Sequence, residues 1–177
     1  MSLPTNQESE QLLEKYIKNE ALREHCRMVA LAMKAYAHKL GEDEELWFQT
    51  GLLHDLDWEM FPDEHPNKAV SEWLASYPSE MLEAIKAHAP HRTGVKANAK
   101  LERYLFACDE LSGFIHAYAL MRPNGYSQMS SSKVKKKLKD KAFAANVSRD
   151  DIQLGFELIE EPDLDHIQFL IDVFDRM

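Results

Sequence analysis

The chain has 177 residues, a length that fits one domain with a sizeable buried core. Apolar residues make up 45% and charged residues 29%, which is an ordinary globular composition and not that of a disordered chain. The net charge of −9 disfavours broad binding to duplex nucleic acid. It leaves room for a small phosphorylated substrate, because a bound metal ion would supply positive charge locally.

The sequence indicates neither a membrane span nor a signal peptide. No apolar run approaches the roughly 18 residues that suggest a membrane span, and the polar start MSLPTNQESEQ lacks the apolar core of a signal peptide. We therefore expect a cytoplasmic protein that is not bound to a membrane. In a reducing compartment, Cys26 and Cys108 are predicted to be small buried side chains and not a disulfide.

Apolar residues recur at helical spacing through almost the whole chain, and strand-like alternation is nearly absent. Gly and Pro positions and acidic first turns place the boundaries. Helices are expected over 8–40 with a break near Asn19, over 42–54, 69–77, 79–90, 97–121, 131–142, 149–160 and 164–176. The sequence therefore predicts an all-α fold, a helical bundle with C-terminal helices packed on it.

The densest cluster of chemically active residues is the segment GLLHDLDWE, residues 51–59. Its apolar helix ends in adjacent His54 and Asp55, at the rim of the core. Neighbouring helical residues point about 100° apart, so the pair converges on one ion only where the helix ends or bends. Alternatively the carboxylate bridges two ions. His25 opens the preceding helix, which we expect to pack antiparallel to the helix that leads to His54.

Three further residues belong to the same group of chemically active side chains. Asp109 lies inside a long apolar helix, where a carboxylate needs a partner or water. Gly113, one turn later, leaves room beside it. His65 follows the loop at Pro62, and His88 ends a predicted helix.

The order of these residues resembles the HD superfamily of metal-dependent phosphohydrolases, with its pattern H…HD…D on a helical bundle. The matching segments are HCRMVALA, LLHDLDWE and FACDELSGFIHA, within about 20–125. The resemblance implies His25, His54, Asp55 and Asp109 as metal ligands. It also implies one HD-type domain over 1–177, with its metal-site core at about 20–125 and a C-terminal helical extension at about 126–177.

Two further segments, EHPNKAVSEWL and AIKAHAPHRTG, resemble HD subfamilies that hold a second ion. The resemblance implies that His65 and His88 are additional ligands and that Asp55 bridges the ions. His91 could compete with His88. Where related enzymes read HDIGK, this chain reads HDLDW. Asp57 therefore replaces Gly, and Trp58 replaces Lys, so that the basic side chain near the substrate phosphate is lost.

Ligands of N and O type, without thiolate, suit one or two divalent transition-metal ions: Fe, Mn, Zn, Co or Ni. The resemblance implies a metal-dependent phosphohydrolase, and we expect it to attack a small phosphorylated substrate, a nucleotide or phosphomonoester, with metal-activated water. Asp55 and Asp57 are the catalytic candidates, with Asp57 orienting the water or moving its proton. Arg92 and Lys86 are candidates for binding phosphate charge.

Two other functions stay open. One is a di-iron oxygenase, because some HD-fold proteins use a similar ligand set for oxygen chemistry. The other is a non-catalytic HD module whose site only binds a nucleotide or a partner, and the intact ligand set argues against it. The lysine cluster at 133–141 is predicted to be a solvated helix face, with collection of phosphorylated substrate as the alternative. His38 and His166 are expected on the surface, and His116 is a weaker candidate for the pocket wall.

Overall fold

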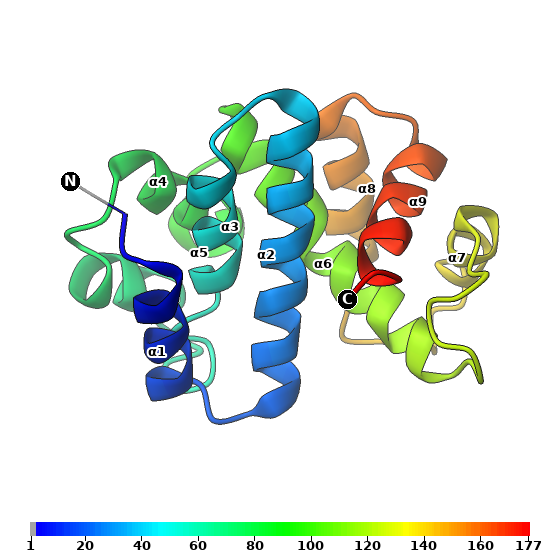
Figure 1. The fold of residues 1–177 in the computed structure, drawn as a ribbon, viewed down its shortest axis with the longest axis horizontal. Helices are drawn as coiled ribbons and strands as arrows, with labels where there is room; N and C mark the ends of the chain where they lie inside the picture. The colour runs from blue at the N-terminus through cyan, green and yellow to red at the C-terminus, as the bar shows by residue number, and fades with distance from the viewer. Residues whose placement is uncertain (1–2) are drawn as a thin grey trace. The chain divides into compact units, whose positions relative to one another are not determined.

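The computed structural model describes residues 3–177, and it is all-α throughout that range, without a strand. This confirms the predicted fold class (Figure 1). The helices are α1 Asn6–Tyr16, α2 Glu20–Leu40, α3 Glu44–Leu53, the π-helical turn η1 Ala69–Trp73, α4 Ser79–Ala87, α5 Pro90–Thr93, α6 Lys100–Leu120, α7 Ser131–Lys137, α8 Arg149–Ile159 and α9 Asp163–Phe174. No helix of this described range is long and apolar enough to cross a membrane.

Local capping explains where the first three helices begin and where α2 ends. Thr5 and Glu8 form a reciprocal capping box at α1, and Asn19 and Asp43 each accept two backbone N–H groups at the starts of α2 and α3. Gly41 ends α2 with φ at +70°, a left-handed conformation that favours glycine. The break near Asn19 and the stop at Gly41 were therefore readable from the sequence.

Helices α1, α2 and α3 lie side by side (Figure 1), and α3 packs against both of the others. The approach of α2 to α3 is unusually close at Gly51. A Cβ atom there would lie 2.8 Å from both Cα and N of Ala30. Because those are backbone atoms, only glycine permits this separation. The α2–α3 contact fixes the helices that carry the first two candidate ligands.

Two expected helices are shorter than predicted. The segment expected to be helical to residue 77 is a π-helical turn that ends at Trp73. Helix α7 ends at Lys137 and not near 142. There, Asp140 accepts hydrogen bonds from the backbone N–H groups of Ala142 and Phe143, which offers the chain a turn in place of further helix.

The chain divides into two compact units, the first ending at Phe106 and the second comprising Ala107–Met177. Helix α6 begins in the first unit and continues into the second. In the second unit Ser148 caps α8 as expected, accepting from the Asp151 N–H. The division into a metal-site core at 20–125 and an extension at 126–177 stays a prediction.

The prediction that His166 lies on the surface is wrong. This side chain on α9 is fully buried in the second unit, and its Nε2 lies 3.1 Å from the carbonyl oxygen of Ala107. Its ring also packs edge-on against Phe156. The prediction of an exposed side chain followed from the polar character of histidine. The side chain can be buried because the carbonyl oxygen of Ala107, far away in the chain, is its hydrogen-bond partner.

Candidate metal centre

The His54-Asp55 doublet lies where α3 stops. The helix ends at Leu53, and His54 keeps helical dihedral angles before the chain enters a series of turns. The His54 side chain is fully buried, and its Nδ1 lies 2.7 Å from the carbonyl oxygen of Gly51. A carbonyl oxygen only accepts, so Nδ1 carries the proton and Nε2 presents a lone pair. The backbone of α3 therefore leaves Nε2 of His54 available to a metal ion.

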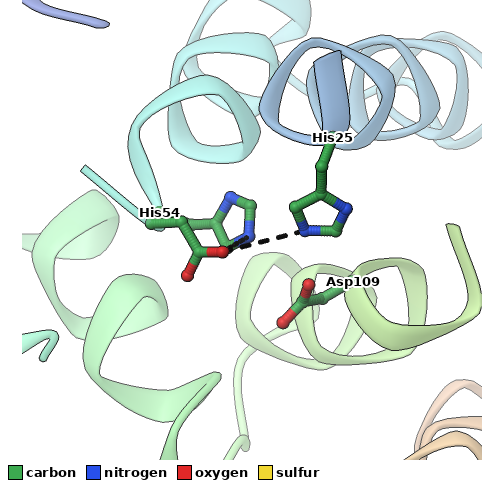
Figure 2. A group of neighbouring side chains, drawn as sticks. His25, His54 and Asp109 are labelled. Atoms are coloured by element: carbon green, nitrogen blue, oxygen red, sulfur yellow. Dashed lines mark ion pairs between the residues drawn. The ribbon is translucent and has the colours of Figure 1, made fainter. Parts of the chain in front are cut away.

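His25 on α2 and His54 face the same oxygen of Asp55. Oδ2 of Asp55 lies 3.8 Å from Nε2 of His25 and 3.5 Å from Nε2 of His54. In Figure 2, dashed lines mark these two ion pairs, which run from the labelled His25 and His54 to one carboxylate oxygen. We call His25 and His54 the Oδ2 pair. His25, His54 and Asp55 each offer one ligand atom, and these atoms lie within 4.8 Å of one another, a spacing that could hold an ion.

A second pair of histidines faces the other oxygen of Asp55. Oδ1 lies 3.5 Å from Nε2 of His65 and 3.6 Å from Nε2 of His88. We call His65 and His88 the Oδ1 pair. With Asp55 they form another group whose ligand atoms lie within 4.8 Å of one another. Asp55 thus belongs to both groups and offers each a different oxygen.

The hydrogen bonds of the Oδ1 pair favour a cation between the rings. Nδ1 of His88 lies 2.5 Å from the carbonyl oxygen of Ile85, and Nδ1 of His65 lies 2.7 Å from Oδ1 of Asp57. Both Nδ1 atoms therefore donate, which leaves lone pairs on the two Nε2 atoms. Those atoms are only 3.0 Å apart. Two facing lone pairs at this distance repel, so a proton or a metal ion must lie between them. The imidazole and carboxylate donors fit a divalent transition metal.

Asp57 lies behind His65. It is fully buried, and its oxygens accept from Nδ1 of His65 and, at 2.8 Å, from the backbone N–H of Ala69. The sequence placed Asp57 near the site but gave no sign of these partners. They depend on the turns that bring 57, 65 and 69 together.

Arg92 and Lys86 occupy different surroundings. Arg92, on α5, donates from Nη1 to the carbonyl oxygen of Pro62 at 2.6 Å, and its guanidinium lies 5.3 Å from the ring centroid of Trp58. Trp58 is exposed and meets His65 edge-on, with 5.0 Å between ring centroids. Arg92 is thereby connected to the Oδ1 pair through one side chain. Lys86 instead forms an ion pair with Glu83 at 2.8 Å.

Asp109, the third residue labelled in Figure 2, lies half-buried on α6, three residues into the second unit. Its role as a ligand stays a prediction. The cysteines are buried, as expected. Burial, with a smaller contribution from the charge of Asp109, holds the pKa of the Cys108 thiol well above its usual range.

Comparison with known proteins supports the same class of site. A family model described as the HD domain matches residues 22–113, which is more than half of the chain and includes all six predicted ligands. The chain belongs to the HD domain family. Proteins of this family are generally metal-dependent hydrolases. No curated protein and no solved structure matched in the other two comparisons.

Proposed function

We propose that this protein is a phosphohydrolase that depends on divalent transition-metal ions and acts on a small phosphorylated substrate, a nucleotide or phosphomonoester. One observation carries the proposal. The two oxygens of Asp55 face two separate histidine pairs. In three of these four histidines, the hydrogen bond at Nδ1 leaves Nε2 as a donor for a metal.

The ligand assignment follows from these two pairs. His25, His54 and one oxygen of Asp55 would hold the first ion. The H…HD…D order that the sequence resembles would add Asp109 as a further ligand of this ion. The Oδ1 pair and the other oxygen of Asp55 would hold the second ion. A carboxylate that serves both groups is what a two-metal hydrolase requires, because ions about 3.5–4 Å apart share such a ligand.

Bound ions of this kind polarise phosphoryl oxygens and make water a nucleophile at neutral pH. The protein's own contribution is to bind and orient the substrate beside them. The guanidinium of Arg92 has five N–H donors, and Nη1 donates one hydrogen bond to the carbonyl oxygen of Pro62. Its other N–H groups can pair with phosphate oxygens. Lys86 is the weaker candidate, since its ammonium already pairs with Glu83.

Metal content and hydrolysis, measured on the same samples, test the proposal. Chelated protein is reconstituted with Mn, Fe, Co, Ni or Zn, and phosphate release is followed with phosphomonoesters and nucleotides. We expect about two ions per chain and phosphate release with at least one metal. Asp55→Ala should lose both ions and at least about 100-fold in activity, since even outer partners of ligands are worth 10–100-fold.

His38→Ala is the matched control. The His38 side chain is 81% exposed, and its ion pair with Glu44 lies at the surface. The variant should keep wild-type metal and activity. Equal metal content in Asp55→Ala and wild type would contradict the assignment. Oxygen consumption without phosphate release, by the iron-loaded protein, would favour the di-iron oxygenase.

A further inference from the structure

We infer that Asp57 is a positioning residue that fixes the tautomer and direction of His65 and so controls binding of the second ion. The inference rests on the proposed two-ion site. Asp57 would touch neither the ion nor the substrate. Its effect would pass entirely through the imidazole of His65.

The three anchored histidines show why Asp57 is needed. His54 and His88 each place Nδ1 against the carbonyl oxygen three residues earlier, that of Gly51 and that of Ile85. Those anchors belong to the helical backbone that precedes each histidine and need no side chain. The equivalent carbonyl for His65 belongs to Pro62.

The carbonyl of Pro62 accepts a hydrogen bond from Arg92. The Nδ1 of His65 instead meets Oδ1 of Asp57 at 2.7 Å. A side-chain carboxylate thus takes the place that a backbone carbonyl has at the other two histidines. Among these three ligands, His65 is the one whose tautomer a single substitution can change.

Asp57 is itself held firmly. Its second oxygen, Oδ2, accepts the backbone N–H of Ala69 at 2.8 Å, at the start of the π-helical turn. The side chain is fully buried. With one oxygen on Ala69 and the other on His65, the carboxylate cannot rotate without losing a buried hydrogen bond. Orienting a water molecule, the role suggested by the sequence, would require one of these oxygens to be released.

Asp57→Asn separates positioning from mere packing, because asparagine has nearly the same shape. The amide oxygen must accept from the Ala69 N–H, since an NH₂ group there would oppose another donor. The NH₂ group then faces His65, so Nδ1 becomes an acceptor and the proton moves to Nε2. A protonated Nε2 cannot ligate a metal. We expect affinity for the second ion to fall about 10–100-fold while the first ion is retained.

The measurements are the number of ions per chain, equilibrium titration with Mn or Zn, and ¹⁵N NMR of the histidine tautomers. In metal-free wild type at pH 8, Nδ1 of His65 should carry a proton, in addition to any proton shared between the two Nε2 atoms. In Asp57→Asn, Nδ1 of His65 should carry no proton and Nε2 should carry one. Asp63→Asn, an exposed acid in the same loop, is the control and should match wild type in all three measurements.

The outcomes separate this inference from the proposed function. Two ions bound by Asp57→Asn with wild-type affinity would overturn the positioning role and leave the metal-dependent hydrolase intact. A wild-type protein that binds no metal would refute the proposed function, while the NMR tautomer would still test the Asp57–His65 contact. If Asp57→Asn fails to fold, wild-type NMR decides, because a wild-type His65 whose Nδ1 carries no proton would overturn the inference.

Discussion

The two pairs of histidines around Asp55 are held in place by different means. The Oδ2 pair comes from α2 and α3, two helices whose backbones meet at Gly51 and Ala30. In the Oδ1 pair, His88 follows α4, but His65 lies in a segment of turns and depends on the side chain of Asp57. Helical backbone therefore positions the histidines of the Oδ2 pair, whereas the Oδ1 pair depends in addition on the contact between the Asp57 and His65 side chains. We expect the Oδ1 side to be the more easily lost.

The largest effect within this comparison is expected from His88→Ala. This change would remove one nitrogen ligand of the proposed second ion but leave His25, His54 and Asp55 in place. The variant should keep its helical circular dichroism, retain one ion and lose at least about 100-fold in phosphate release, more than the loss of an outer partner. Metal analysis and the phosphate assay measure both.

His91→Ala is the control for His88→Ala, because His91 is exposed three residues further along and was the competing candidate from the sequence. It should behave as wild type. If His88→Ala kept both ions and His91→Ala lost one, the ligand would be His91. If both variants kept two ions, the Oδ1 side would not be a metal site.

A change at the helix contact of the Oδ2 side should act mainly on stability. Gly51→Ala would place Cβ 2.8 Å from Cα and N of Ala30, and backbone cannot move aside as a side-chain end can. The helices must separate, which should cost about 1–3 kcal/mol in the free energy of unfolding. For a chain of this length, that corresponds to roughly 2–4 °C in melting temperature for each kcal/mol.

Thermal unfolding with and without metal checks this expectation. Glu45→Ala, on the exposed face of the same helix, removes only a surface ion pair with Lys34 and should change the melting temperature little. Unchanged stability in Gly51→Ala would show that the α2–α3 contact is looser than its geometry indicates. The Oδ2 side would then have no advantage in rigidity over the Oδ1 side.

The contrast between the two sides also explains what the sequence could predict. The segment that ends in His54 and Asp55 was clear because helical periodicity and caps are local signals, and the family model now includes that segment. The contact between Asp57 and His65 was not predicted. It depends on how a run of turns closes and on the amide of Ala69, and no periodicity records either.

The error at His166 has a related cause. Its burial is stabilised in part by the carbonyl of Ala107, 59 positions away in the chain, and a polar side chain gives no sequence signal of such a partner. The early end of α7 was not predicted because Asp140 lies inside the segment 131–142, whose apolar spacing is helical. Its carboxylate accepts hydrogen bonds from the backbone N–H groups two and three residues later. Side-chain hydrogen bonds account for both errors.

The smallest effect is expected where the two sides are joined at the surface. Oε2 of Glu59 accepts the backbone N–H groups of Lys18 and Asn19, each at 2.8 Å, and so joins the turns after the doublet to the turn before α2. Glu59 is exposed, so water can replace its hydrogen bonds at little cost. Glu59→Ala should lower the melting temperature by about 1–3 °C and leave both ions bound.

Glu64→Ala, exposed in the same segment, is the control and should leave the melting temperature unchanged. Loss of an ion from Glu59→Ala alone would mean that this surface contact, and not the α2–α3 packing, aligns His25 with the doublet.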